Sequence, residues 1–471
     1  MSSAFHVVVV GAGPGGYAAA IRCAQLGLRT TLVERDALGG VCLNLGCIPS
    51  KAMLRSAEVL GLIRSAAEFG LSVQQIDPTY GAIVDRRDRI VARLRMGLTN
   101  LLRANGVAVV RGDGRIIGPH TLSVSANGSA GPELSFDSLI IATGSHSAPL
   151  PVPGATLPSV IDSDGALGLR EAPRRAVVIG AGAVGVEWAE VWRAFGSEVT
   201  IVEMLDQLVP TEDSDVAREL ERAFARKGIQ CLTSTRVQAI QSAGGNLEVV
   251  IRVDAGERVF PADVVLVAVG RRPNLTGLGV EAAGLPPDPD GIATDGQMRT
   301  AVPHVYAVGD VTGRFLLAHV ATHQGIIAAQ AIAGRDPVPF DEHVVPGAIF
   351  THPEIASVGL RERDARSRGL PVTVGRFPLA ASGRAAVSGD TAGFVKIVAD
   401  EESREVLGVH IVGPGAGDLM GEASLAMRLR ATIDDLADTI HVHPTFSEAL
   451  LEAAWSAAGT PLHVPPLRRE T

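Results

Sequence analysis

Short apolar runs that end at a glycine recur along the chain, and they predict buried strands. Each run contains four to six consecutive apolar residues, most of them β-branched, at 7–10, 139–142, 176–179, 264–269 and 305–308. Unbroken apolar runs of this length are typical of parallel strands whose two faces are both covered. Alanine-rich segments of helical length follow the first and third runs. The pattern therefore predicts α/β units built on parallel sheets.

The hydrophobic pattern changes from about residue 346 onward. Segments 347–350, 394–398 and 406–412 have strand length and are interleaved with helical patterns such as 419–429. This order of elements predicts an α+β domain with an antiparallel sheet. Earlier in the chain, apolar residues recur at helical spacing from Tyr80 to Asn105, and Gly106 is the expected C-terminal stop. The proline-rich stretch 149–158 is interpreted as a linker.

One pattern occurs twice, displaced by 169 residues. Each copy consists of a strand, a glycine loop, a helix, a second strand and an acid about 20 residues after the loop, which is the fingerprint of dinucleotide-binding units. The first glycine permits a tight turn, the second lets the backbone approach a pyrophosphate, and the third allows close helix packing. The loop glycines are Gly11, Gly13 and Gly16 in the first copy and Gly180, Gly182 and Gly185 in the second.

The acids of the two copies are Glu34 and Glu203, and each is expected to accept hydrogen bonds from a ribose. Two unrelated glycine-rich turns are the alternative, and the shared acid positions argue against it. Two sites in one chain point to one tightly held and one exchanging cofactor, for which a flavin and a nicotinamide are the natural pair. Glu203 suits an unmodified ribose, and no arginine follows it, so NAD(H) is preferred over NADP(H).

Two cysteines, Cys42 and Cys47, lie shortly after the first glycine loop. A thiol pair beside a bound dinucleotide can exchange two electrons with it. The spacing offers no second pair of ligands, so no metal site is predicted. The alternative is two buried apolar thiols, which is how we interpret Cys23 and Cys231.

Composition excludes several classes of protein. The chain has 471 residues, a formal charge of −9 and four cysteines. An acidic chain without a basic tract argues against nucleic-acid or anionic-membrane partners. Four thiols make no disulfide framework, and the apolar N-terminal run is too short for a signal or a membrane span. We therefore expect a cytoplasmic protein with no membrane span.

Taken together, these motifs resemble the flavin- and disulfide-dependent pyridine nucleotide oxidoreductases, and within that family the dihydrolipoyl dehydrogenases. The resemblance covers essentially the whole chain, although Val41 stands where the family usually has threonine. The runs that carry it are 11–16, 39–51, 180–187, 270–274, 309–310, 350–354, 393–396, 410–414 and 443–448.

The resemblance implies a fold class and a division into domains. The fold class is α/β, with two Rossmann-like dinucleotide-binding domains and a C-terminal α+β dimerisation domain. We place the FAD-binding domain at 1–148, the NAD-binding domain at 149–270, the second part of the FAD-binding region at 271–345, and the interface domain at 346–471.

The resemblance also implies the roles of individual residues. FAD would lie on the first glycine loop, with Glu34 at its ribose, Lys51 near the isoalloxazine and Asp310 at the ribityl chain. NAD would occupy the second loop, with Glu187 near the nicotinamide and Glu203 at its ribose. Gly144 and Gly270 are assigned to the cofactor sites as well. Arg271 and Arg272 are interpreted as solvated loop charges, and a solvated helix lysine is the alternative for Lys51. Glu187 is expected to pair with Lys51 across the two domains, because a paired carboxylate spares a buried lysine a large desolvation cost.

The same resemblance makes Cys42 and Cys47 a redox-active disulfide, with Cys42 exchanging with the substrate sulfur and Cys47 facing the flavin. Dithiol oxidation also needs a base near pH 7, and histidine fits that requirement. His443 would act as that base from the other subunit of a homodimer, with Glu448 as its orienter.

Two questions about this histidine stay open from sequence. His441 alternates with His443 in extended backbone, so the two rings would face opposite ways. Residues 445–448 also fit a capping box that opens a helix from Glu448 to Ala458, so Glu448 has a structural alternative.

The implied activity is the oxidation of protein-bound dihydrolipoamide, with electrons passing through the cysteine pair and FAD to NAD+. The expected partner is a lipoylated acyltransferase (E2) or another lipoyl protein. The alternatives are a related disulfide or quinone reductase, or a docking subunit of a 2-oxo acid dehydrogenase complex.

Overall fold

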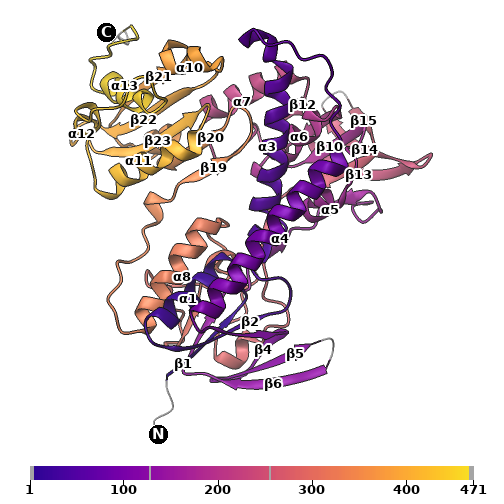
Figure 1. The fold of residues 1–471 in the computed structure, drawn as a ribbon, viewed down its shortest axis with the longest axis vertical. Helices are drawn as coiled ribbons and strands as arrows, with labels where there is room; N and C mark the ends of the chain where they lie inside the picture. The colour runs from indigo at the N-terminus through magenta and orange to yellow at the C-terminus, as the bar shows by residue number, and fades with distance from the viewer. Residues whose placement is uncertain (1–4, 127–128, 254–255, 466–471) are drawn as a thin grey trace.

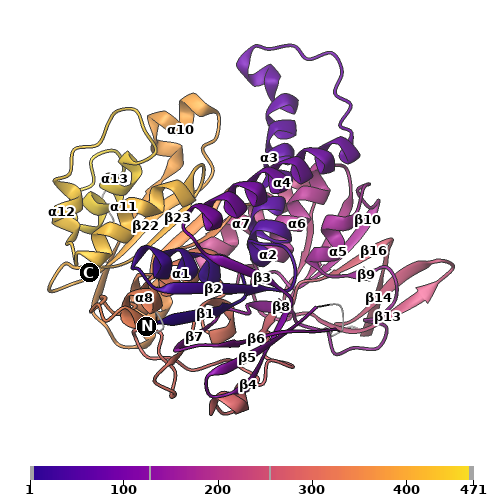
Figure 2. The ribbon, with the colours of Figure 1, turned by 60° about the horizontal axis from the view of Figure 1, so that its bottom comes forward.

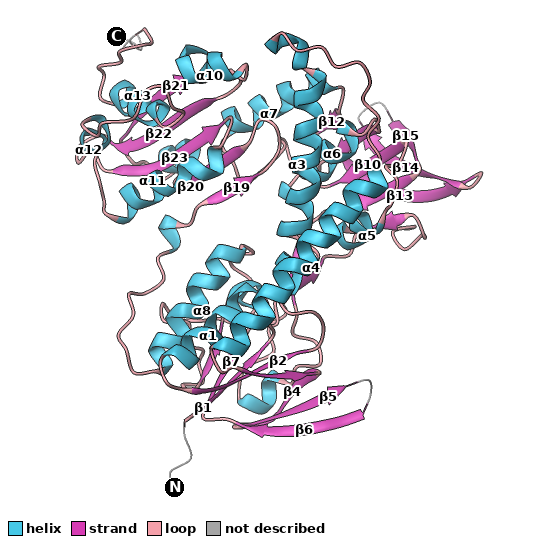
Figure 3. Ribbon diagram, in the orientation of Figure 1, coloured by secondary structure: helices cyan, strands magenta, loops and turns pink. Residues whose placement is uncertain are grey.

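The chain folds around three main sheets, two of them parallel and one antiparallel (Figure 1). The computed structural model describes residues 5–126, 129–253 and 256–465. Figure 3 shows that helices flank each of these sheets. The predicted fold class is confirmed, because two α/β units precede a C-terminal α+β unit.

The first sheet is parallel, and its strand order is β3-β2-β1-β7-β18. Its central strands are fully buried, as the apolar runs predict, and the last strand returns from more than 150 residues downstream. Helices α1 and α8 lie side by side next to this sheet (Figure 1). The bounds are β1 (His6–Val10), α1 (Pro14–Gln25), β2 (Arg29–Glu34), β3 (Ala108–Arg111), β7 (Ser138–Ile141), β18 (Val305–Ala307) and α8 (Ala318–Ile332).

The second sheet repeats the first, with the order β12-β11-β10-β16-β9. The repeat predicted from sequence extends to strand register: Val10 pairs with Val33 in the first sheet, and Ile179 pairs with Val202 at equivalent positions in the second. The bounds are β9 (Val160–Ile161), α5 (Ser163–Gly168), β10 (Arg175–Ile179), α6 (Ala183–Ala194), β11 (Glu198–Val202), α7 (Ser214–Lys227), β12 (Gln230–Leu232) and β16 (Val264–Val267).

Two small antiparallel sheets and a two-stranded ribbon accompany the parallel sheets. They consist of β4 (Asp113–Gly118), β5 (Thr121–Ala126) and β6 (Ser129–Ser135); of β13 (Arg236–Ala243), β14 (Asn246–Val253) and β15 (Gly256–Ala262); and of β8 (Ser145–Ser147) with β17 (Arg271–Pro273).

Two long helices pack against each other and connect the first α/β unit to the second (Figure 2). They are α3 (Cys47–Arg64), preceded by the short α2 (Gly40–Asn44), and α4 (Tyr80–Ala104). The predicted helix from Tyr80 to Asn105 is confirmed. It ends where expected, since Gly106 has a left-handed φ of 72° and donates to the Arg103 carbonyl.

The C-terminal unit is a five-stranded sheet, ordered β19-β20-β23-β22-β21, in which every pairing is antiparallel, as predicted. The bounds are β19 (Gly347–Ile349), β20 (Ile355–Gly359), α9 (Glu362–Ser367), β21 (Val372–Pro378), α10 (Gly383–Ser388), β22 (Phe394–Asp400), β23 (Val406–Val412), α11 (Ala416–Arg428), α12 (Ile433–Ala437) and α13 (Glu448–Ala457).

Several sequence-based expectations about burial can now be checked. Cys23 is fully buried, as expected, whereas Cys231 is only partly buried because it lies on the edge strand β12. Within the described ranges, no helix is both long and apolar enough to cross a membrane. The same ranges contain no group of side chains that could hold a metal ion.

Candidate active site

The first glycine loop joins β1 to α1. Gly11 has a φ of 99°, and a side chain there would collide with the Ala142 carbonyl. A side chain on Gly16 would collide with the carbonyl oxygen of Gly11, so the third glycine lets the helix approach the loop. Gly13 precedes α1 as its N-cap and supplies no side-chain cap. The N–H groups of the first helical turn are therefore free to bind an anion.

The second loop repeats this geometry between β10 and α6. Gly180 has a φ of 101°, and a side chain on Gly185 would collide with the Gly180 carbonyl. A Cβ on Gly182 would meet open space, so the room beside this residue is available to a ligand. The roles predicted for all three glycines agree with their local geometry.

The acids of the repeat hold their own glycine loops. Glu34 accepts hydrogen bonds from the backbone N–H of Ala12 at 2.7 Å and of Asp36 at 2.8 Å. Glu203 accepts in the same way from Ala181 at 2.7 Å and Leu205 at 2.8 Å. Sequence reasoning missed this loop-fixing role, although the equal spacing of acid and loop in both copies was its signal. The ribose contacts of Glu34 and Glu203 remain a prediction. Each carboxylate oxygen accepts one backbone N–H and retains a second lone pair that could accept a ribose hydroxyl.

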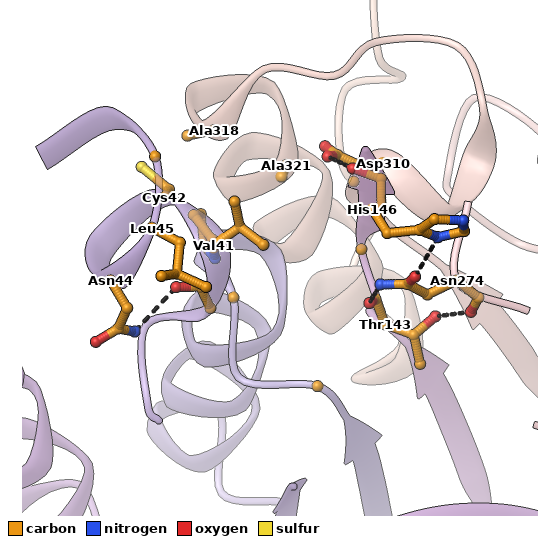
Figure 4. A pocket seen from close by; sticks show the side chains of 18 of the residues that line it. Val41, Cys42, Asn44, Leu45, Thr143, His146, Asn274, Asp310, Ala318 and Ala321 are labelled. Atoms are coloured by element: carbon orange, nitrogen blue, oxygen red, sulfur yellow. Dashed lines mark hydrogen bonds between the residues drawn. The ribbon is translucent and has the colours of Figure 1, made fainter. Parts of the chain in front are cut away.

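A cavity of about 1720 Å³ runs from the first glycine loop to the start of α6. It exceeds the usual size of small-molecule pockets and has the extent that a dinucleotide requires. Figure 4 shows Cys42 on one side and His146, Asn274 and Asp310 on the other. The predicted site residues that line it are Gly11, Gly13, Glu34, Cys42, Cys47, Lys51, Gly144, Glu187 and Asp310.

The other predicted residues do not line this cavity. Gly16, Gly180 and Gly185 are packing positions of the two loops. Gly182 lies in the second loop, and Glu203 follows β11 and accepts the Ala181 N–H of that loop; both lie outside the cavity. Gly270 has a φ of 114° and follows β16 at the edge of the second sheet. His443 and Glu448 lie in the C-terminal unit.

Cys42 lies in the middle of the short helix α2, and Cys47 is the first residue of the long helix α3. Both are free thiols here, so the structure has the reduced form of the pair that the resemblance implies. A hydrogen bond from Cys42, opposed by burial and aided by the Lys51 ammonium, lowers the pKa of Cys47 to about 7. That hydrogen bond and burial raise the pKa of Cys42. These opposite shifts favour ionisation of Cys47 before Cys42, in agreement with the role that the resemblance implies.

Lys51 lies one helical turn after Cys47 on α3. Its ammonium donates to both carboxylate oxygens of Glu187, at 2.9 and 2.8 Å, which confirms the pairing predicted between the two units. Glu187 is buried in α6 and also accepts the backbone N–H of Phe350 at 3.0 Å. The ammonium lies 4.8 Å from the centre of the Phe350 ring. These contacts fix a positive charge beside the cysteines and at the cavity wall.

Asp310 reaches the cavity from the segment that follows β18. Its carboxylate accepts the Ser145 hydroxyl at 2.5 Å, and Arg271 donates through Nε to that hydroxyl oxygen at 2.8 Å. Burial raises the pKa of Asp310, against the opposing effects of Ser145 and Arg271. The interpretation of Arg271 as a solvated loop charge is therefore wrong. The tertiary pairing of β8 with β17 brings these residues together, and nothing in the local sequence indicates it.

His443 and Glu448 form the predicted pair, with His443 Nδ1 at 2.8 Å from Glu448 Oε1. The second oxygen of Glu448 accepts the Thr445 N–H at 2.7 Å. Glu448 therefore orients the imidazole and holds the Thr445 backbone with different oxygens. The capping box that residues 445–448 could form is incomplete, because α13 begins after Ser447 without a side-chain cap. Burial raises the pKa of Glu448, but the hydrogen bonds from Thr445 and His443 outweigh it and hold that pKa below its ordinary value.

The structure separates the two candidate histidines by exposure. The His443 side chain is 77% exposed, so it is free to act on another molecule. His441 is 6% exposed and contacts the Glu422 carboxylate at 2.8 Å and the Thr439 carbonyl at 2.9 Å. Within one chain, neither lines the cavity that holds the cysteines.

Comparison with known proteins gives consistent matches over the whole chain. The family described as pyridine nucleotide-disulphide oxidoreductase matches residues 5–325, and its dimerisation domain matches residues 345–454. A dihydrolipoyl dehydrogenase from Chlamydia muridarum is 42% identical over 475 residues, covering 100% of each chain.

Two solved structures have the same fold. LpdA from Mycobacterium tuberculosis superposes with a TM-score of 0.89 at 30% identity, covering 96% of this chain and 99% of that one. The HOCl-induced flavoprotein disulfide reductase RclA from Escherichia coli gives a TM-score of 0.85 at 27% identity, with coverage of 96% and 99%.

Proposed function

The chain belongs to the pyridine nucleotide-disulphide oxidoreductase family, and on that premise we propose that it oxidises dihydrolipoamide to lipoamide with NAD+ as the final acceptor. It is an enzyme that uses FAD and NAD. The observation that carries the proposal is the Cys42–Cys47 pair, which lies with the Lys51–Glu187 ion pair on the wall of one dinucleotide-sized cavity.

The cavity residues fit FAD. The uncapped N-terminus of α1 faces a pyrophosphate, Glu34 keeps acceptor sites for a ribose, and Asp310 offers a carboxylate for the ribityl hydroxyls. The second glycine loop and Glu203 fit NAD in the same way. Bound FAD would supply a two-electron acceptor for the reduced cysteine pair and a two-electron donor for NAD+.

The chemistry of the cysteine pair follows from its two different thiols. In the oxidised pair, a substrate thiolate attacks Sγ of Cys42, the Cys42–Cys47 bond breaks, and Cys47 leaves as the thiolate. The low pKa of Cys47, about 7, makes it the better leaving group. The second substrate thiol then attacks the substrate sulfur of the mixed disulfide, which forms lipoamide and releases Cys42. The substrate loses two electrons, and the pair gains them.

The protons of the dithiol need an acceptor, and we assign this role to His443 of a second subunit. Its ring is exposed and held at Nδ1 by Glu448, which leaves Nε2 free to take a proton. The match to a dimerisation domain supports a homodimer. We propose that two-fold pairing brings His443 of one chain to the cysteines of the other.

The partner is a lipoylated acyltransferase or another lipoyl protein, and the compartment is the cytoplasm. A lipoyl arm carried on a separate protein is the form of dihydrolipoamide that such a dimer would oxidise. The small number of cysteines supports a reducing compartment, because four thiols in 471 residues make no disulfide framework.

The decisive experiment replaces Cys42 by serine. The Cys42→Ser enzyme should retain its flavin absorbance and lose dihydrolipoamide oxidation, because the mixed disulfide has no sulfur on which to form. Cys231→Ser is the matched control, since that thiol lies outside the cavity, and it should keep full activity. Full turnover by Cys42→Ser would refute the proposal.

A second experiment places the base across the dimer. Cys42→Ser and His443→Gln enzymes, each inactive alone, should regain part of the activity after subunits are exchanged, because one mixed site then carries both native residues. No recovery with exchange demonstrated would exclude a base supplied by the partner chain.

The similarity to RclA supports a second candidate function, the reduction of another disulfide. The two candidate functions differ in substrate and share the same cysteine chemistry. Rates of NADH oxidation with lipoamide, a quinone and unrelated disulfides distinguish them, and lipoamide should give the highest kcat/KM. Flavin retention without turnover of any acceptor would instead favour a docking subunit.

A further inference from the structure

The two glycine loops are held by equivalent hydrogen bonds, but the residues that donate one of these bonds differ between the two copies. In each copy, the alanine after the first glycine donates its N–H to the acid of the repeat, and its carbonyl accepts a backbone N–H from further along the chain. The carbonyl of Ala12 accepts from Gly39 at 2.8 Å, and the carbonyl of Ala181 accepts from Val209 at 2.9 Å. The two donors therefore occupy equivalent places in the repeat.

The backbone conformations of Gly39 and Val209 differ in conformational energy. Gly39 has a φ of 100°, which a glycine adopts freely. Val209 has a φ of 42°, and a β-branched residue in this left-handed region is strained. Such strain persists only where the surrounding structure over-determines the backbone. The contacts around Val209 show what imposes it.

The carbonyls that follow Val209 are held by two arginines of the C-terminal unit. Arg363 donates to the Pro210 carbonyl at 2.9 Å, and Arg361 donates to the Pro210 and Thr211 carbonyls at 3.3 and 3.0 Å. Arg361 is the N-cap of α9, and Arg363 is in its first turn. Charged donors make the stronger class of hydrogen bond to a carbonyl.

A buried lysine fixes the same segment at its other end. Lys396 on β22 is 2% exposed, and its ammonium donates to Asp213 at 2.9 Å and to Asp215 at 2.8 Å. Asp213 also accepts the backbone N–H of Glu362 at 2.8 Å. The C-terminal sheet and α9 thus hold residues 210–215, which lie between the strained Val209 and the first turn of α7.

The direction of one peptide links this segment to the nucleotide site. The Ala181 carbonyl and the Gly182 N–H belong to the same planar peptide group, so fixing the carbonyl fixes the N–H. That N–H belongs to the loop at the N-terminus of α6, which would bind the pyrophosphate. Val209 orients the carbonyl, and the arginines and Lys396 hold the residues that follow Val209.

We propose that Arg361, Arg363 and Lys396 are positioning residues for NAD, through which the C-terminal unit sets the affinity of the second nucleotide site. The proposal rests on the proposed function, because it takes the second loop as the NAD site. The residues act through Val209 and Ala181 and do not contact the nucleotide. Loosening the C-terminal contacts lets Val209 leave its strained conformation and releases the Ala181 carbonyl.

The test uses the FAD-bound enzyme and compares Arg361→Ala/Arg363→Ala with a matched control, Arg368→Ala. Arg368 is exposed at the far end of α9, so the control removes positive charge from the same helix. Titration calorimetry should give a dissociation constant for NAD+ that rises about fivefold in the double variant, the lower end of couplings between sites. The dissociation constant of the Arg368→Ala control should stay within about twofold of the wild-type value, which is below the range of couplings between sites.

Two further readouts separate positioning from a general loss of structure. The KM for NAD+ should rise while the KM for dihydrolipoamide stays unchanged, and hydrogen exchange should increase in segment 207–213 without NAD+ present. The Arg363→Lys variant keeps a charged hydrogen-bond donor, so its dissociation constant for NAD+ should be closer to the wild-type value than that of Arg363→Ala.

An unchanged dissociation constant in the double variant, with wild type binding NAD+ normally, overturns this inference and leaves the proposed function intact. Equal increases in both KM values also overturn it, because they indicate a structural effect. A wild-type enzyme that binds no NAD+ overturns the proposed function and this inference together.

Discussion

Replacing Lys51 by methionine is expected to raise the pKa of the Cys47 thiol. Methionine keeps much of the side-chain volume and removes the ammonium. Among the described residues, the change leaves the buried Glu187 carboxylate with the Phe350 N–H at 3.0 Å as its remaining hydrogen-bond partner, and that negative charge opposes ionisation of Cys47. Loss of the Lys51 ammonium and loss of the charge partner of Glu187 both raise the pKa of Cys47.

The magnitude follows from the shift that the structure imposes. The pKa of Cys47 falls from 9.0 to about 7, which favours the thiolate. The Cys42 hydrogen bond contributes most and the Lys51 ammonium also favours the thiolate, so we expect the loss of Lys51 to raise this pKa by about one unit, a factor of ten in the ionisation constant. At pH 7 the thiolate fraction then falls from about one half to about one tenth.

The assay is the pH dependence of Cys47 alkylation by iodoacetamide. A Cys42→Ser background leaves Cys47 as the reactive thiol, since burial raises the pKa of Cys23 and of Cys231 to about 12 and keeps both protonated. Because the thiolate reacts, the rate should rise with pH to a plateau, and the midpoint of the rise gives the pKa of Cys47 in this background, which lacks the Cys42 thiol. Adding Lys51→Met should move this midpoint up by about one pH unit.

Lys227→Met is the matched control. Lys227, at the end of α7, pairs at 2.6 Å with Glu190, which belongs to α6 like Glu187. The Lys227→Met variant therefore removes one lysine charge from a partner on α6, as Lys51→Met does, but away from the cavity. Its midpoint should equal that of the background. An unchanged midpoint in the Lys51→Met variant would refute the assignment of a role for this ammonium in the Cys47 environment.

Further predictions concern the base and the glycine loops. His443→Gln should lower kcat for dihydrolipoamide by roughly 10² to 10⁴ with flavin absorbance retained, and wild-type turnover would exclude His443 as the base. Glu448→Ala should lower kcat less and lower the free energy of unfolding by about 1 kcal/mol, because the hydrogen bond from the Thr445 N–H is lost; an unchanged melting temperature would contradict this stabilising role. Gly185→Ala should unfold at lower temperature than wild type, because its Cβ collides with the Gly180 carbonyl. Gly182→Ala should keep the wild-type melting temperature and weaken NAD+ binding, and equal effects of the two on melting would contradict the loop geometry.

Sequence by itself determined the parts of this protein that depend on neighbours along the chain. Apolar runs of strand length need burial on both faces, and left-handed turns need glycine at Gly11 and Gly180. Both requirements are local, so the repeat of 169 residues and the position of the cysteine pair could be recognised without coordinates. The pairing of Lys51 with Glu187 was also predictable, because a motif placed both at one site.

Tertiary structure decided which distant groups meet. Arg271 reaches Asp310 through Ser145 only because β17 pairs with β8, and the carbonyls that follow Val209 are held by two arginines from the distant helix α9. Exposure likewise separates His443 from His441, which alternation along the strand could not do. Backbone conformation is set by adjacent residues, whereas burial and ion pairing depend on chain segments that sequence does not place in space.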